Sequence, residues 1–250
     1  MSAQRDRYLA EIGISAWRLR GAGAGPESLR AAAAAPDAVA PHAAAPDAAV
    51  ALEPSRAGTP AADAGGAWET LAAAVRACTK CALHRGRTQT VFGVGRRDAQ
   101  LLVIGEAPGA EEDRQGEPFV GRAGQLLNAM LHSIGLPRSE VYIANILKCR
   151  PPGNRDPQPD EAASCTPYLA QQIALVKPRA ILAVGRIAAQ WLLQSDAPIG
   201  RLRGRVFRYG EAGTPLVVTY HPAYLLRSPG EKAKAWTDLC TVRDLLSNER

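Results

Sequence analysis

The chain has 250 residues, 46% of them hydrophobic, so it can bury one sizeable core. Its formal net charge of +6 and its pI near 9.3 favour a polyanionic partner, because lysine and arginine release counterions condensed on phosphates; mild basicity alone is weak support. The sequence contains no apolar run of about 18 residues and no apolar signal region in residues 1–20. We therefore expect no membrane span, no secretion and a cytoplasmic location.

The first quarter of the chain differs in composition from the rest. Residues 1–20 hold a short apolar cluster that is too small to fold alone and that we interpret as a docking peptide; the alternative is a helix packed on its own domain. Residues 21–66 are rich in alanine, proline, glycine and aspartate, and 12 of the 20 residues from Ala31 to Val50 are alanine. Because recurring prolines break helices and little apolar bulk is present, we predict a disordered linker here and one domain over residues 67–250.

Beyond the linker, short apolar runs alternate with amphipathic stretches. The apolar runs predict buried strands at Leu101–Ile104, Val141–Ala144, Ala180–Val184 and Leu216–Thr219. The amphipathic stretches predict helices at Ala123–Ile134, Pro159–Val176, Arg186–Leu193 and Lys232–Leu246. This alternation predicts an α/β fold with a mostly parallel central sheet and helices on both faces, in which ligands bind beyond the carboxyl ends of the strands.

Four of the five cysteines are candidate metal ligands. Cys78 and Cys81 form a Cys-x-x-Cys pair, and Cys149 and Cys165 follow, separated by fifteen residues. In a reducing compartment such a set favours a metal centre over disulfides. Four thiolates suit an iron–sulfur cluster or zinc; zinc sites usually use two close pairs of ligands, but zinc remains open on ligand type alone.

Three predicted strands end in candidate site residues. The first leads into Gly105-Glu106-Ala107-Pro108-Gly109, where glycines let the backbone approach a ligand and Glu106 projects at the pocket mouth. The second ends in Asn145, whose amide both donates and accepts and can read a base edge. The last leads to His221, a donor followed by an apolar and basic loop. Taken singly, the Gly105–Gly109 segment also fits a plain turn, Asn145 a turn residue, and His221 a surface or capping histidine.

Two neighbouring segments also have simple interpretations. The acidic run at residues 111–113 fits a solvated face or the charged N-terminal turn of a helix. Leu225 and Leu226, in the loop after the last strand, fit core residues as well as a wedge that enters a duplex.

In combination and in order, the motifs resemble the family 4 uracil-DNA glycosylases, repair enzymes of bacteria and archaea that carry a 4Fe-4S cluster. The resemblance spans roughly Trp68 to Leu246 and rests on Cys78-x-x-Cys81, Gly105-Glu106-Ala107-Pro108-Gly109, Pro118-Phe119-Val120-Gly121, Asn145, Cys149, Cys165 and His221-Pro222-Ala223-Tyr224. It implies a three-layer α/β/α glycosylase fold and a cluster held by Cys78, Cys81, Cys149 and Cys165. The cluster would brace the Arg150–Arg155 segment beside DNA.

The resemblance also implies the reaction. Uracil is flipped out of the DNA stack, its N-glycosidic bond is hydrolysed and an abasic site remains. The implied uracil-binding residues are Gly105, Glu106, Ala107, Phe119, Asn145 and His221. Phe119 would stack on the base, Asn145 would read its Watson–Crick edge, and His221 would donate to uracil O2 as negative charge builds there. Glu106 and His221 are the implied catalytic pair, with Glu106 positioning water or stabilising the oxocarbenium sugar.

The remaining contacts implied are with DNA and with a second protein. The expected DNA-binding residues are Arg150, Arg155, Leu225, Leu226 and Arg227. Residues 150–159 contain no histidine that could trap the base covalently, so we expect ordinary turnover by a monomeric, monofunctional enzyme. The alternatives are a cluster-bearing protein that binds DNA or uracil with little turnover, and an electron-transfer protein. Tyr8–Arg20 resembles the peptide by which the psi subunit of the bacterial clamp loader holds the chi subunit, which implies chi of DNA polymerase III as a partner.

Overall fold

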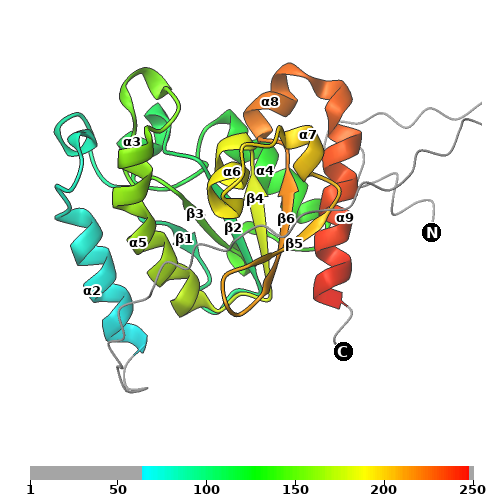
Figure 1. Ribbon diagram of the computed structural model, residues 1–250, viewed down its shortest axis with the longest axis horizontal. Helices are drawn as coiled ribbons and strands as arrows, with labels where there is room; N and C mark the ends of the chain where they lie inside the picture. The colour runs from blue at the N-terminus through cyan, green and yellow to red at the C-terminus, as the bar shows by residue number, and fades with distance from the viewer. Residues whose placement is uncertain (1–63, 248–250) are drawn as a thin grey trace, which may run out of the picture. The chain divides into compact units, whose positions relative to one another are not determined.

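The computed structural model describes residues 64–247, shown in colour in Figure 1. The predicted docking peptide, and the predicted linker up to residue 63, lie outside the described residues. The strands are β1 (Val94–Gly95), β2 (Leu101–Gly105), β3 (Tyr142–Asn145), β4 (Ala180–Val184), β5 (Val206–Tyr209) and β6 (Thr214–Thr219). The α-helices are α2 (Ala64–Arg76), α3 (Ala110–Gln115), α4 (Arg122–Ser133), α5 (Pro159–Val176), α6 (Arg186–Leu193), α7 (Ile199–Leu202), α8 (Pro222–Arg227) and α9 (Lys232–Ser247). The 3-10 helices are η1 (Ala82–Arg85), η2 (Arg138–Glu140), η3 (Pro152–Asn154) and η4 (Pro229–Glu231).

The strands form one six-stranded sheet in the order β1-β3-β2-β4-β6-β5. The four central strands are parallel, and the short edge strands β1 and β5 are antiparallel to their neighbours. Gly105 pairs with Asn145, and Val184 pairs with Thr219. The register therefore aligns the carboxyl ends of the central strands along one edge of the sheet, where the chain continues into the candidate site residues.

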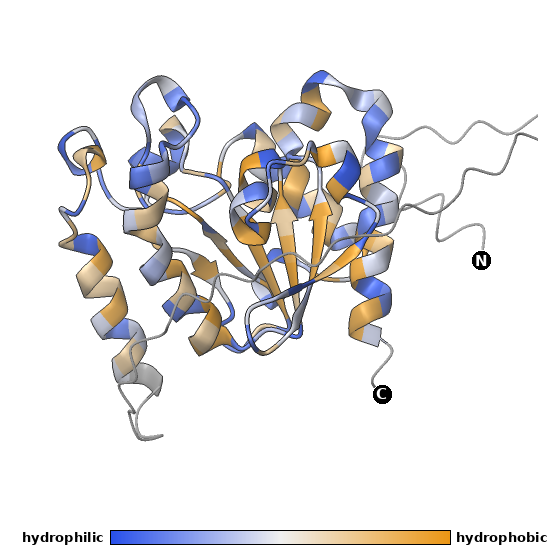
Figure 2. Cartoon of the chain, viewed as in Figure 1, coloured by the Kyte–Doolittle hydropathy of each residue, from blue (hydrophilic) through white to orange (hydrophobic). Residues whose placement is uncertain are grey.

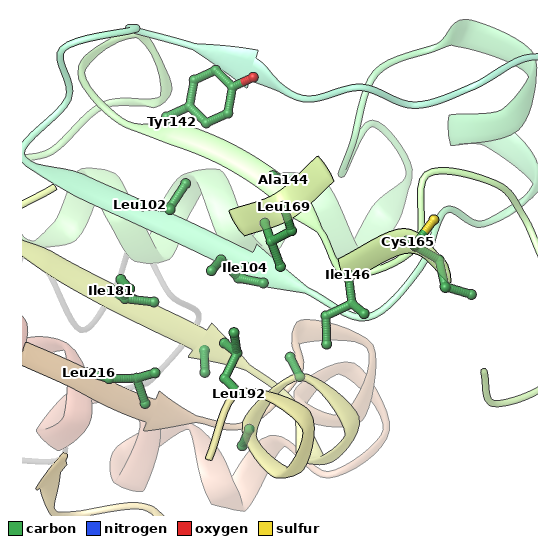
Figure 3. Close-up of a cluster of buried hydrophobic side chains, with 14 of the residues drawn as sticks. Leu102, Ile104, Tyr142, Ala144, Ile146, Cys165, Leu169, Ile181, Leu192 and Leu216 are labelled. Carbon is green, nitrogen blue, oxygen red and sulfur yellow. The ribbon is translucent and has the colours of Figure 1, made fainter. Parts of the chain in front are cut away.

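Helices cover both faces of this sheet, which confirms the predicted three-layer architecture (Figure 1). Alternate residues of one strand face opposite layers: Leu102 and Ile104 belong to the hydrophobic cluster formed with α5 and α6, whereas Leu101 and Val103 belong to the one formed with α4 and α9. Because both faces are covered, the central strands are almost continuously apolar. Figure 2 shows them as hydrophobic arrows, and Figure 3 shows the first cluster.

The four predicted strands and four predicted helices are confirmed, with ends that differ by two residues at most. The long helix α5 begins where Pro159 predicted, because proline suits the first helical turn and Glu161 Oε2 accepts a hydrogen bond from the backbone N–H of Gln158 at 2.9 Å. The sequence did not predict α2, nor the edge strands, α3, α7 and α8; these last elements are too short for a periodic pattern.

Helix α2 begins at Ala64, three residues before the boundary predicted for the domain. It packs against α5: Leu71 and Val75 form a small buried cluster with Tyr168. Trp68 adds a ring contact with Tyr142 of β3 at 5.2 Å between centroids. The end of α2 is therefore fixed beside α5 and β3, and this places the Cys-x-x-Cys segment that follows it. No helix within residues 64–247 is long and apolar enough to cross a membrane.

Candidate active site

A cavity of about 490 Å³ opens beyond the carboxyl ends of the strands. The predicted site residues that line it are Glu106, Ala107, Phe119, Asn145, Arg155, His221 and Arg227. They come from segments that follow β2, β3 and β6, so the sheet register gathers residues that are far apart in the sequence. Gly105 lies beneath this lining at the end of β2.

Gly105, Phe119 and Asn145 are packed so closely that the glycine has no room for a side chain. A Cβ atom at Gly105 would lie 2.4 Å from Asn145 Oδ1 and 2.6 Å from Phe119 Cζ. Phe119 itself has a positive φ of 54°, which is uncommon for a bulky residue. Arg138 holds this loop, because its guanidinium donates to the backbone O of Pro118 at 2.7 Å and of Phe119 at 3.4 Å. One wall of the cavity is therefore rigid before any ligand arrives.

Asn145 carries a hydrogen-bond acceptor that the described part of the protein does not use. The residue is only 2% exposed, yet its Oδ1 has no hydrogen-bond partner among the described residues. Buried polar atoms are nearly always paired, because an unpaired one loses the hydrogen bonds of water without replacement. An unpaired amide oxygen on the wall of a cavity is a position for a ligand that donates a hydrogen bond.

His221 faces the same cavity as a neutral hydrogen-bond donor. Its Nδ1 accepts a hydrogen bond from the backbone N–H of Ala223 at 3.1 Å, in the N-cap position of α8. Burial, assisted by the charge of Arg227, lowers the pKa of His221 to about 4. The imidazole is therefore neutral at pH 7, and because Nδ1 accepts, the proton is on Nε2. The imidazole lies 5.7 Å from the Phe119 ring, measured between centroids.

Glu106 is the carboxylate of the cavity with the most perturbed acidity. Burial, together with the negative charge of Asp156, raises the pKa of Glu106 to about 7, while Arg186 opposes the shift. Asp156 also lines the cavity and pairs with Arg186 at 2.6 Å. A carboxyl group that titrates near neutral pH in a cavity is suited to proton transfer or to stabilising positive charge.

The acidic run 111–113 is not simply a solvated face, and this interpretation is wrong for two of its three residues. Glu112 Oε2 accepts from the backbone N–H of Gly109 at 3.1 Å, and Oε1 accepts from those of Val120 and Gly121 at 3.0 and 3.1 Å. Glu112 thus joins the two loops that line the cavity. The spacing Gly109-x-x-Glu112, a capping-box pattern, was the signal in the sequence.

The other two residues of the run behave differently. Asp113 is buried and accepts from the backbone N–H of Thr88 at 2.9 and 3.1 Å, so it ties α3 to the segment that follows η1. Glu111 pairs with Arg114 on the surface, as expected for a solvated position. All three acids do lie in the first turn of α3, as the alternative interpretation predicted.

The residues predicted to contact DNA separate into two groups. Leu226 is exposed and Arg227 lines the cavity, as a DNA-facing position requires. Leu225 is 1% exposed and lies in the core with α4 and α9, so the prediction that it contacts DNA is corrected; its neighbour Leu226 is on the outer side of α8. Tyr224 of α8, also exposed, lines the cavity and was not predicted as a DNA contact.

Two predicted arginines lie on the far side of the mouth, near η3. Arg155 lines the cavity and forms a bidentate pair with Glu161, at 2.8 and 2.6 Å, which fixes its guanidinium. Arg150 donates through Nε to Asn154 Oδ1 at 2.8 Å. Asn154 and Asp156, both cavity residues, were missed because polar residues in a proline-rich loop give no periodic signal.

The four cysteines line one small second cavity. Cys78 follows α2, Cys81 precedes η1, Cys149 follows β3 and Cys165 lies in α5. No group of three or more histidine, cysteine, aspartate and glutamate side chains within residues 64–247 is arranged as a site for a single metal ion. The four predicted thiols nevertheless line one cavity, at a place where α2, the loop after β3 and α5 meet.

Two of these sulfurs accept hydrogen bonds from basic residues. Arg87 Nη1 donates to Cys149 Sγ at 3.1 Å, and the backbone N–H of Lys148 lies 3.5 Å from Cys165 Sγ. Burial raises the pKa of the Cys165 thiol to about 11, and that of Cys149 is raised for the same reason. Burial also lowers the pKa of Lys148 to about 7, while the Cys165 sulfur opposes that shift, so negative charge in this cavity favours the ammonium form.

Comparison with known proteins agrees with this arrangement. The family described as "Uracil DNA glycosylase superfamily" matches residues 92–240. The type-4 uracil-DNA glycosylase of Archaeoglobus fulgidus is 42% identical over 183 residues, which cover 70% of this chain and 92% of that protein. The type-4 enzymes of Pyrobaculum aerophilum and Thermotoga maritima are 43% and 42% identical, over 66% and 64% of this chain and 87% and 83% of their own. The chain therefore belongs to the uracil-DNA glycosylase superfamily, among relatives of type 4.

Proposed function

We propose that this protein is a monofunctional uracil-DNA glycosylase of DNA base-excision repair, which hydrolyses the N-glycosidic bond of uracil and leaves an abasic site. The observation that carries the proposal is the unpaired, buried Oδ1 of Asn145 in a cavity that also presents a stacking ring and a neutral imidazole donor. The names of the type-4 relatives support it. Proteins that act on a base must first rotate it out of the stack, so the ligand of this cavity is a flipped nucleotide.

Recognition of the base follows from the amide of Asn145. Uracil presents an N–H group beside a carbonyl on its Watson–Crick edge, and one asparagine side chain can accept from the first and donate to the second. Cytosine presents the opposite order of donor and acceptor, which leaves the same amide unpaired. Phe119 offers the face of its ring for stacking, and Gly105 and Ala107 let the backbone approach the base. The cavity therefore selects uracil by hydrogen-bond pattern as well as by shape.

Bond cleavage uses His221 and Glu106. As the bond between the sugar and the base breaks, its electron pair moves to uracil and negative charge collects on O2. The Nε2–H of the neutral His221 donates to that oxygen, and a buried donor stabilises developing charge strongly because water is excluded. The ionised Glu106 orients water and stabilises the positive sugar carbon, to which the water oxygen adds while its proton neutralises the departing uracil anion. The position of Glu106 in the cavity and its raised pKa support this role.

The second cavity is proposed to hold a 4Fe-4S cluster on Cys78, Cys81, Cys149 and Cys165. An all-thiol donor set suits iron–sulfur clusters, and N–H groups that point at two of the sulfurs fit a negatively charged group bound there. When bound, the cluster supplies structural cross-linking of α2, the loop after β3 and α5. Zinc remains the alternative on ligand type.

The remaining proposals concern partners. Arg155 and Arg227 line the first cavity, Arg150 contacts the lining residue Asn154, and Leu226 is exposed on α8. These four residues are proposed to contact DNA on either side of the flipped nucleotide. We propose a monomeric enzyme that acts in the cytoplasm. Residues 1–20 are proposed to bind the chi subunit, with residues 21–66 joining this peptide to the enzyme domain.

Release of uracil from an oligonucleotide with a single uracil tests the function. Wild-type protein should turn over many substrate molecules, and Asn145→Ala and His221→Ala should lower the rate about 10²- to 10³-fold, the usual cost of one preorganised donor. Glu106→Gln should lower it as well. Tight binding without release by the wild type would instead support a binding protein, and unchanged rates in all three variants would mean that the site is elsewhere. A protein–DNA adduct that survives SDS would contradict ordinary turnover.

A further inference from the structure

Lys148 is a fully buried lysine between the two cavities. Its Nζ donates to the backbone O of Asn145 at 2.8 Å and to Oε1 of Gln172 at 2.6 Å. Its backbone N–H points at Cys165 Sγ, 3.5 Å away, and its backbone O accepts from the N–H of Val91 at 2.8 Å. One residue thus touches the backbone of the asparagine in the first cavity and a cysteine of the second.

Gln172 fixes the lysine from the opposite side. It lies in α5, the helix that also carries Cys165, and it is fully buried. Since an ammonium group can only donate, the amide must turn its oxygen toward Lys148 and its nitrogen away. That nitrogen donates to the backbone O of Phe92 at 2.9 Å and lies 3.2 Å from the Tyr142 hydroxyl. The network spans β3 from Tyr142 at its start, labelled in Figure 3, to Asn145 at its end.

The acceptors of this lysine are all neutral. No carboxylate within residues 64–247 pairs with Lys148; its Nζ contacts one backbone carbonyl and one amide. For comparison, the buried Asp238 pairs with Arg203 at 2.9 Å. A buried ammonium without an anion is costly, and such a group is kept when a neighbouring charge offsets the cost. The neighbouring group able to do so is the cysteine cavity, whose lining includes Lys148.

We propose that Lys148 is a positioning residue that couples the metal centre to uracil recognition. Its ammonium offsets the negative charge of the sulfur-bound cluster, and its hydrogen bond to the backbone O of Asn145 fixes the amide that reads uracil. Gln172 orients the lysine for both contacts. This inference rests on the proposed function, since it presumes a cluster in one cavity and uracil in the other.

The test compares full-length, cluster-loaded Lys148→Met and Gln172→Met with wild type. Methionine matches glutamine in length, is one atom shorter than lysine, and is tolerated in cores. Two quantities are measured: the concentration of free uracil that halves release from the oligonucleotide, and the reduction potential of the cluster. Lys148→Met should require roughly tenfold more uracil for inhibition, since a hydrogen bond from a charged donor is lost. It should also shift the potential to a more negative value, because removal of a nearby positive charge disfavours reduction.

Gln172→Met separates the two effects, because it disturbs the orientation of Lys148 and leaves the charge. It should weaken uracil inhibition by several-fold with a smaller change of potential. Lys232→Met at the start of α9 is the matched control and should change neither quantity. Unchanged uracil inhibition and unchanged potential in Lys148→Met would overturn the inference. If that variant does not fold, unchanged inhibition in Gln172→Met overturns it. A wild type without iron–sulfur absorbance or without uracil release would instead refute the proposed function.

Discussion

The two cavities at the carboxyl ends of the strands differ in whether their polar groups already have hydrogen-bond partners in the protein. The larger one contains an amide oxygen without a hydrogen-bond partner among residues 64–247, a histidine kept neutral and a carboxyl group whose pKa is raised to about 7. In the smaller one, two of the four sulfurs already accept hydrogen bonds from the protein. Polar groups that lack a partner or have a shifted pKa suit a ligand that enters and leaves. Sulfurs that already accept hydrogen bonds suit a permanently bound group. The first cavity is therefore built for turnover and the second for stability.

The largest effect is expected from removing a ligand of the proposed cluster. Cys165→Ala should abolish the broad visible absorbance of the cluster and lower the melting temperature by many degrees, because metal binding contributes folding free energy. Cys240→Ala, which removes a cysteine outside the cavity, is the matched control and should keep both the colour and the melting temperature. A colourless wild type with bound zinc would show that the second cavity holds a different metal.

A smaller effect is expected from adding one methyl group to the first cavity. Gly105→Ala should destabilise the protein by roughly 1 to 3 kcal/mol, the usual cost of overpacking, because the new Cβ would meet Asn145 and Phe119. Denaturant unfolding measures the loss, and uracil release should fall as both side chains are displaced. Gly200→Ala, where nothing lies within 4 Å of the added carbon, should be close to neutral. Equal stability of the two variants would refute the tight packing at Gly105.

The raised pKa of Glu106 predicts opposite dependences of activity and stability on pH. Uracil release should increase as pH rises through about 7, because the ionised carboxylate is the active form. The favourable contribution of the group to folding is present below its unfolded pKa of about 4.5 and is lost as pH rises through about 7. Glu106→Gln should therefore stabilise the fold by about 1 kcal/mol at pH 8, an amount reduced by solvent screening, and should not do so at pH 4. A variant equally stable to wild type at both values would contradict the raised pKa.

The smallest effect is expected from the part of the chain outside both cavities. Deletion of residues 1–20 should leave uracil release and visible absorbance unchanged and should abolish binding to the chi subunit, measured by calorimetry with purified chi. Retained binding in the deletion variant would reject the docking peptide, and lost uracil release would mean that these residues belong to the catalytic domain.

The sequence predicted the fold and the cavity residues where a local pattern was strong. Buried parallel strands are continuous apolar runs, so Ala180–Val184 could be read directly, and Asn145 and His221 were found because they follow such runs. The four cysteines line one cavity, as the resemblance of the sequence to a known family implied.

The remainder depends on contacts that a linear pattern does not contain. Leu225 and Leu226 are chemically alike, and only the packing of α8 on the core decides which of them is exposed. Asp156 reaches the cavity through a loop, and Glu112 acts on backbone groups eight and nine residues further along the chain. Lys148 resembles a surface lysine beside a basic loop until the sheet and α5 enclose it.

The comparison of the two cavities is tested most directly by single-turnover uracil release from wild type and His221→Ala, prepared by the same procedure, with the visible absorbance per protein and the melting temperature measured for each. The account predicts that His221→Ala keeps the full absorbance and the melting temperature of the wild type while release slows about 10²- to 10³-fold. A variant that releases uracil at the wild-type rate, or one that loses its absorbance together with its activity, would contradict the separation of catalysis from the metal centre.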